Sequence, residues 1–187
     1  MINKSNSAYI FLFLATLFWA GNFVVGKFAS YYEIPPFSLN FYRWFFAWLI
    51  LAPFTIQEII KKKNYIIKNY KYYVILGITS VTIFNSIVYY SLNFTQVISG
   101  VLMISTIPVM IMFISSILKI EKTNIFQILG VACSFLGVIL IVTKANFQIL
   151  INLDFNKGDI TMVLAMLSWA TYSALLKKKK HELSQLT

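Results

Sequence analysis

The sequence predicts an all-α integral membrane protein, a bundle of about six transmembrane helices. Three observations support this prediction: an apolar composition, uncharged runs long enough to span a bilayer, and a one-sided distribution of lysine. Of the 187 residues, 59% are hydrophobic and 12% are charged, which is far more apolar than a soluble domain. A soluble fold of this composition would lack the polar surface needed to cover its core.

The uncharged runs indicate how many spans to expect. A bilayer core of about 30 Å needs about 20 helical residues to cross it. The run 72–118 has room for two crossings, with a turn near Asn93–Gln96. A further span follows Pro35 and Pro36, because proline suits the start of a helix. The expected spans are 8–28, 37–56, two within 72–118, 124–143 and 159–176.

The lysine distribution predicts the orientation. With a cytoplasmic N-terminus, twelve lysines lie on the inner side and three on the outer side, namely Lys27, Lys144 and Lys157. This is the positive-inside pattern, so the net charge of +10 reports topology and attraction to anionic lipid. It indicates no nucleic-acid partner. The first apolar run is too long for a signal peptide and has no small-residue cleavage site before Lys27, so we expect it to be retained.

The residues that carry most catalytic chemistry are scarce. One cysteine, Cys133, and one histidine, His181, exclude a disulfide framework and an ordinary zinc site. No nucleophile, metalloprotease or phosphate-binding motif occurs. We therefore expect no enzyme, no cofactor and no metal site.

An internal repeat links the first and last expected spans. Residues 14–27 (LATLFWAGNFVVGK) align with 164–177 (LAMLSWATYSALLK) at six of fourteen positions, including Trp19 with Trp169 and Lys27 with Lys177. Because the offset is five helices, an odd number, the two copies cross the membrane in opposite directions. Many secondary transporters use such inverted repeats to expose one site alternately to the two sides.

The repeat divides the chain into three parts. Residues 1–143 form a five-helix repeat, 144–158 an outer loop, and 159–187 the first helix and cationic tail of a second, truncated repeat. A complete second repeat would extend the chain to roughly 300 residues. Two interpretations stay open: a truncated chain, or a half that works with a partner half or as a homodimer.

Several motifs follow one another in a recognisable order. The opening stretch has a Trp–small–x–x–Phe core and a basic residue near its end, and 33–50 (EIPPFSLNFYRWFFAWLI) places Arg43 in the second span. There follow 91–122 with mid-helix Pro108, 126–142 with spaced glycines, and 158–176, which repeats the opening pattern. Together these segments resemble an EamA domain of the drug/metabolite transporter superfamily, followed by the start of a second such domain.

The resemblance implies a function and a location. It implies secondary transport, export more often than uptake, of a small metabolite such as an amino acid, by alternating access in the inner (cytoplasmic) membrane of a bacterium. The implied partners are the small-molecule substrate, the lipid bilayer and a second half. The alternative is a non-transporting membrane subunit or fragment that needs a partner half.

Polar residues inside a bilayer usually face the bundle interior or a watery cavity. Helical spacing groups such residues on one face each of the first, third and fourth spans. Packing between helices is the alternative explanation of these faces. The candidate substrate-pathway residues are Trp19, Asn22, Phe23, Arg43, Thr82, Asn85, Tyr89, Ser99, Thr106, Pro108 and Trp169.

Further expectations concern single residues. Arg43 either binds an anionic group of a substrate or has a structural or gating role. Pro108 should kink its helix, Gly130 and Gly137 should face a close helix contact, and Lys27 should reach toward the outer interface and Glu33.

The acidic residues bear on the substrate. All six are expected outside the spans: Glu33, Glu58, Glu121, Asp154, Asp159 and Glu182. The small multidrug pumps, relatives in the same superfamily, keep a glutamate in their first helix to exchange protons for cations. The absence of one here favours a neutral, zwitterionic or anionic substrate over a lipophilic cation.

Overall fold

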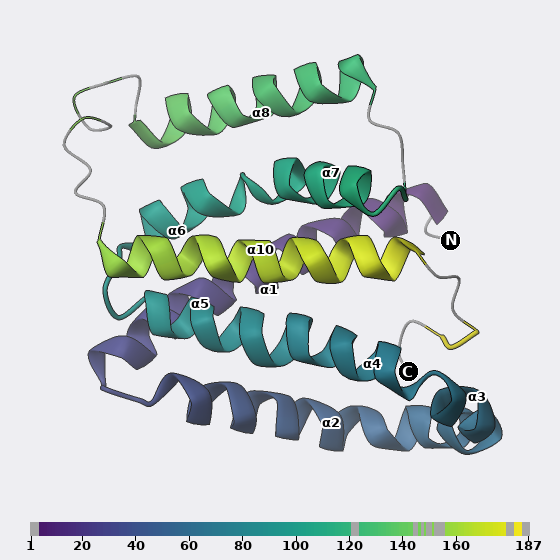
Figure 1. Ribbon diagram of the computed structural model, residues 1–187. Helices are drawn as coiled ribbons and strands as arrows, with labels where there is room; N and C mark the ends of the chain where they lie inside the picture. Colours follow the sequence, from purple (N-terminus) through teal and green to yellow (C-terminus); the bar gives the residue numbers. More distant parts are fainter. Residues whose placement is uncertain are drawn as a thin grey trace.

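The computed structural model describes residues 4–120, 124–143, 146, 148, 151, 156–178 and 182–184. Successive long helices along the chain run in opposite directions, and the start of α1 and the end of α10 lie at the same end of the bundle as α3 (Figure 1). The helices are α1 (Lys4–Tyr31), α2 (Pro36–Lys61), α3 (Lys63–Lys68), α4 (Tyr70–Gly77), η1 (Ile78–Asn85), α5 (Ser86–Ser91), α6 (Val97–Ile104), α7 (Ile107–Ile117), α8 (Ile125–Thr143) and α10 (Lys157–Lys178).

Five of the expected spans are confirmed as helices long and apolar enough to cross a membrane: Ala8–Tyr31, Pro36–Lys61, Tyr70–Ser91, Val97–Ile117 and Lys157–Lys178. The expected turn at 93–96 and the expected helix start at Pro36 are also present. The sixth expected span corresponds to α8, a helix of 19 residues whose described apolar stretch, Ile125–Gly137, is shorter. Most of the outer loop 144–158 and part of the lysine tail lie outside the described residues.

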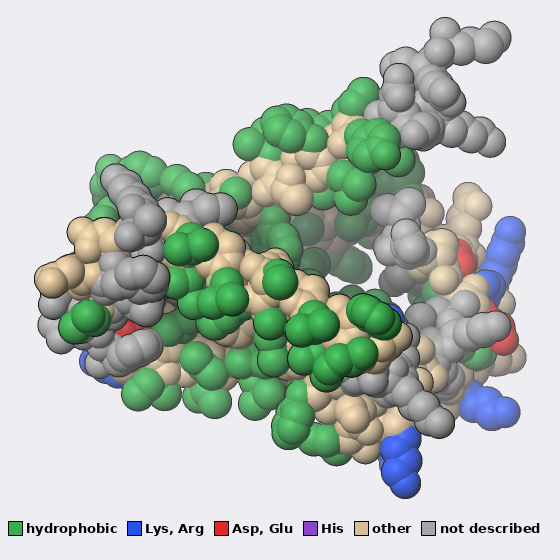
Figure 2. Space-filling model, turned by 90° about the horizontal axis from the view of Figure 1, so that it is seen from above, with side chains coloured by type: hydrophobic (Ala, Val, Ile, Leu, Met, Phe, Trp, Pro, Cys, Tyr) green, Lys and Arg blue, Asp and Glu red, His purple; other side chains and the backbone are tan. Residues whose placement is uncertain are grey.

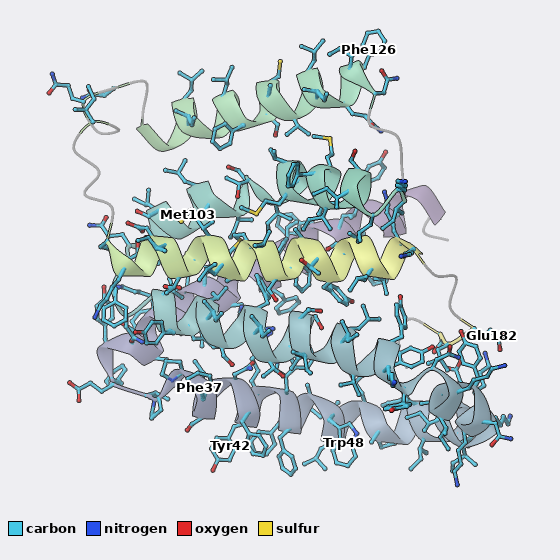
Figure 3. The ribbon with its side chains drawn as sticks, in the orientation of Figure 1. Phe37, Tyr42, Trp48, Met103, Phe126 and Glu182 are labelled. Carbon is cyan, nitrogen blue, oxygen red and sulfur yellow. The ribbon has the colours of Figure 1, made fainter. Side chains whose placement is uncertain are left out.

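The helix from the end of the chain lies inside the bundle. α10 packs between α4, η1 and α5 on one side and α6 and α7 on the other, whereas α8 packs along α6 and α7 (Figure 1). The core between these helices contains Phe84, Val88, Leu92, Met162 and Met166, each at most 3% exposed. Met103 points from α6 toward α10 (Figure 3).

The outer surface suits lipid. Large apolar side chains such as Phe11, Phe54 and Phe126 are mostly exposed, and Tyr42 and Trp48 point away from the bundle (Figure 3). Figure 2 shows hydrophobic atoms over the middle of the molecule and most of the visible Lys and Arg atoms at one end. Without water around the middle, such a surface carries no penalty.

Two helices end in the same hydrogen-bonded motif. Glu33 and Lys119 have positive φ, at 54° and 53°. After α1, Ile34 N donates to Ala29 O at 3.0 Å and Glu33 N to Ser30 O at 3.3 Å, and the same pair of bonds recurs around Lys119. This left-handed cap satisfies the last carbonyls of a helix and turns the chain.

Two helices differ from the regular spans expected. The third span contains the π-helical segment η1, with wider turns. The fourth span is broken rather than kinked: α6 ends at Ile104, and Pro108 lies in the first turn of α7, where its missing N–H costs no helical hydrogen bond. Gly130 and Gly137 have no described atom within 4 Å of the position of a Cβ, so the close contact expected there is not found among the described residues.

Candidate functional site

Arg43 is the centre of a polar cluster that joins the first three spans. Its Nη1 donates hydrogen bonds to Asn22 Oδ1 at 2.7 Å, to Asn85 Oδ1 at 3.3 Å and to the hydroxyl oxygen of Tyr89. The Tyr89 hydroxyl donates in turn to Asn22 Oδ1 at 2.6 Å. The structure thus brings together four residues that the sequence suggests only as separate candidates, from α1, α2, η1 and α5.

A cavity of ≈ 420 Å³ adjoins this cluster. This volume lies within the range of small-molecule sites. Its walls are mainly apolar, with five aromatic side chains among the twelve described lining residues, and its polar atoms come from a few residues of α1, α2, η1 and α10. The lining residues are Leu12, Ala15, Thr16, Trp19, Asn22, Arg43, Trp44, Ser80, Phe84, Asn85, Trp169 and Tyr172.

The two repeat-related tryptophans meet beside this cavity. The ring centroids of Trp19 and Trp169 are 6.2 Å apart, and Trp169 also packs on Phe84 at 4.6 Å and on Tyr172 at 5.1 Å. α1 and α10 run in opposite directions (Figure 1). In the sequence alignment Asn22 corresponds to Tyr172, and both line the cavity, so aligned positions of α1 and α10 contribute to it.

The π-helical segment positions Asn85. Its side-chain Nδ2 donates to Ser80 O at 2.8 Å, five residues earlier, which leaves Oδ1 for Arg43. Neighbouring carbonyls of η1 accept bonds from other helices: Thr79 O from Ser168 Oγ at 2.8 Å, and Val81 O from Asn40 Nδ2 at 2.9 Å. The sequence analysis missed this segment, because no sequence signal distinguishes η1 from a regular helix.

The other predicted pathway residues lie apart from this cavity. Phe23 is 4% exposed and belongs to the core. Thr82 lines a second cavity of ≈ 360 Å³ between α2 and η1, together with Asn40 and the aromatic rings of α2. Ser99 in α6 is half-buried, Thr106 donates to Met103 O at 2.6 Å at the break between α6 and α7, and Pro108 is exposed.

A further polar cluster at the start of α10 was also missed. Asp159, expected outside the membrane spans, lies in the first turn of this span and is 4% exposed. It accepts hydrogen bonds from Asn156 N at 3.0 Å and from the Thr95 hydroxyl, while Asn156 Oδ1 accepts from Gly158 N at 2.7 Å. The sequence Asn-Lys-Gly-Asp fits a capping box. This motif indicates, from the sequence alone, that Asp159 lies in the first turn of α10.

Lys27 binds the other side of the same turn. Its Nζ donates to Leu92 O at 2.8 Å and to Thr95 O at 3.0 Å, so it satisfies carbonyls at the end of α5 instead of reaching Glu33 as expected. A cation near a helix C-terminus also interacts favourably with the helix dipole. α1 and α10 therefore hold the turn after α5 from two sides.

Comparison with known proteins supports a transporter family. The profile of the EamA-like transporter family matches residues 6–143. The chain belongs to this family. The matched residues run from α1 to the end of α8, and they include every described cavity-lining residue except those of α10.

Several curated relatives carry transporter names. The "uncharacterized transporter YyaM" of Bacillus subtilis is 26% identical over 172 residues, 92% of this chain and 56% of the relative. An "uncharacterized transporter" of Archaeoglobus fulgidus is 27% identical over 185 residues, 95% of this chain and 61% of the relative. The chain thus spans little more than half the length of these relatives. No solved structure matches it.

Proposed function

We propose that this EamA-family chain forms part of a secondary transporter that moves a small metabolite, such as an amino acid, out of the cell. The observation that carries the proposal is the cavity beside the Arg43 cluster, lined by equivalent faces of α1 and α10. The contact between Trp19 and Trp169 supports an inverted repeat, and transporters of that design place their site near mid-membrane between the repeats. The proposed step is alternating access, without a chemical reaction, cofactor or metal.

The same proposal includes a second half. The part aligned with this chain is 56% of one matched relative and 61% of another, and in this proposal α10 alone corresponds to the second repeat. We infer that the transporting unit contains the remaining helices of that repeat, on the same polypeptide, on a separate one or in a second copy. The runner-up function, a membrane subunit inactive until its partner half joins, rests on the same observation.

The location follows from the charges. Most of the described lysines belong to α3 or to helix ends on the same side of the bundle as α3, and Figure 2 shows most of the visible Lys and Arg atoms gathered at one end. Under the positive-inside rule that end faces the cytoplasm. The N-terminus then lies inside, in an inner (cytoplasmic) membrane.

A metabolite screen tests transport through this cavity. Cells expressing the protein are compared with cells expressing Trp19→Ala or Asn22→Leu, and the metabolites accumulated in the medium are profiled at equal membrane abundance. We expect at least one metabolite to accumulate several-fold less with either variant. Val24→Ala is the matched control, because Val24 is 48% exposed on the same helix.

The alternative outcomes are distinct. Unchanged export with both variants at normal abundance would remove the cavity from the transport path. If abundance falls in parallel with export, the two side chains act in packing, and the assignment of the site fails.

A further inference from the structure

The charge on Arg43 has no acidic partner among the residues that the structure describes. The single ion pair recorded among the described residues joins Lys62 and Glu58, at the end of α2. Arg43 Nη1 binds three neutral oxygen atoms, and its Nε and Nη2 make no hydrogen bond to any described residue. These two nitrogens form the side-on edge of the guanidinium, which matches a carboxylate with two parallel bonds.

A cation at this depth needs a counter-charge. Arg43 follows the start of α2 by seven residues, about 10 Å along the helix axis, and charges inside a bilayer usually pair with one another or mark a substrate path. None of the described residues that line the cavity is acidic. A cationic ligand would therefore meet a like charge and no carboxylate there.

The walls favour a flat apolar group beside that charge. Trp19, Trp169 and Tyr172 present aromatic rings from α1 and α10, and Trp44 lies next to the guanidinium with its ring centre 5.5 Å from Arg43 Cζ. Rings in such a setting stack or pack edge to face with a ligand ring. One end of the ligand is thus specified as anionic and the rest as apolar and planar.

We propose that the cavity binds a small organic carboxylate with a planar apolar group. The carboxylate binds the Nε and Nη2 edge of Arg43, and the planar group packs on Trp19 and Trp169. That this ligand is the transported substrate rests on the proposed function. Amino-acid zwitterions and simple carboxylic acids share this chemistry, whereas amines lack it.

Three probes that share a phenylethyl skeleton test whether the cavity prefers a carboxylate to an amine. 3-Phenylpropionate has only the carboxylate, phenylalanine has the carboxylate and an ammonium group, and phenethylamine has only the ammonium group. Binding to the purified chain in lipid nanodiscs is measured by calorimetry and by quenching of tryptophan fluorescence. We expect 3-phenylpropionate to bind at least tenfold more tightly than phenethylamine. Phenylalanine separates the two sources of carboxylate: binding equal to that of 3-phenylpropionate assigns amino acids, and weaker binding assigns simple acids.

Variants test the role of Arg43. Arg43→Gln should abolish carboxylate binding, and Lys68→Gln, which removes an exposed cation outside the cavity, should leave it unchanged. Because Arg43 also links three spans, Arg43→Lys is the second variant: it keeps the charge but loses the side-on edge, so carboxylate binding should weaken while the preference over the amine persists. The proposal is overturned if phenethylamine binds as tightly as the acid, or if folded Arg43→Gln binds the acid like the wild type.

The binding assay and the transport assay test two separate proposals. Carboxylate binding without flux in any cell assay would leave this assignment standing and remove the proposed function. If export depends on Trp19 but no carboxylate binds, the proposed function stands and the assignment of a carboxylate ligand fails.

Discussion

Asn40 shows how much one polar side chain contributes at the residue scale. It is 6% exposed, and its Nδ2 donates both to Val81 O and to Ser86 Oγ, each at 2.9 Å. These bonds join α2 to η1, which holds Asn85, and to the first residue of α5. Its Oδ1 is buried without a hydrogen-bond partner among the described residues, which offsets part of the gain.

We predict that Asn40→Leu destabilises the protein by about 1–3 kcal/mol, because it leaves buried polar atoms of the facing helix without their partner. The measurement is the midpoint of denaturant unfolding in detergent. Thr82→Val is the matched control: Thr82 is exposed in the same second cavity, so its midpoint should stay within error. A raised midpoint for Asn40→Leu would mean that the unpaired Oδ1 outweighs both hydrogen bonds.

Sequence reasoning identified the polar residues but not their partners. Helical spacing selects Asn22, Asn85 and Tyr89 as buried or pathway residues, because polar groups in a bilayer avoid lipid. It carries no information on which helices are neighbours, so the meeting of Arg43 with all three was not predictable. Lys27 is a similar case, since the carbonyls it binds became available only through the position of the α5 terminus.

At the scale of the elements, α10 approaches α5 closely. Ser91 Oγ and Thr161 Oγ1 are 2.8 Å apart, and a Cβ on Gly158 would lie 2.8 Å from both Ser91 O and Phe94 Cβ. The absence of a side chain at Gly158 is therefore what lets the first turn of α10 and its Asp159 cap reach the turn after α5. Small residues commonly permit such approaches between membrane helices.

We predict that Gly158→Ala lowers the stability of the folded protein by about 1–3 kcal/mol, because the new methyl group overlaps backbone and must displace one helix. Gly137→Ala is the matched control. Nothing described lies within 4 Å of a Cβ at that position, so alanine should leave stability unchanged or raise it through its higher helix propensity. Thermal unfolding followed by circular dichroism measures both. Equal melting temperatures for the two variants would contradict the close contact at Gly158.

The elements were largely predictable and their irregularities were not. Uncharged runs and proline positions predict the spans and the turn at 93–96, because hydropathy reports burial in lipid. Side chains of α2 and α10 donate to Val81 O and Thr79 O of η1, and at the break the Thr106 hydroxyl donates to Met103 O. Such tertiary contacts leave no periodic signal in one sequence.

At the scale of the whole molecule, the two ends of the bundle differ in charge and in which of them lies nearer the cavity. At one end Lys27 and Asp159 hold the turn after α5. At the other end lie α3, the start of α1 and the end of α10 (Figure 1), and most of the visible Lys and Arg atoms (Figure 2). Leu12 and Tyr172, which line the cavity, lie in the halves of α1 and α10 nearer the lysine-rich end. The side of the membrane that this end faces therefore decides which way the described cavity is oriented.

We predict that the lysine-rich end is cytoplasmic. Inverting the chain would place twelve lysines on the outer side, and each cation near the anionic inner leaflet contributes about 1 kcal/mol of surface attraction, in addition to the bias during insertion. Asn64, in α3, and Asn93, in the turn after α5, are replaced one at a time by cysteine in a Cys133→Ser background, because native Cys133 is exposed. A membrane-impermeant thiol reagent should label Asn93→Cys in intact cells and Asn64→Cys only after permeabilisation. Labelling of Asn64→Cys in intact cells, with Asn93→Cys protected, would reverse the orientation of the protein and of its cavity.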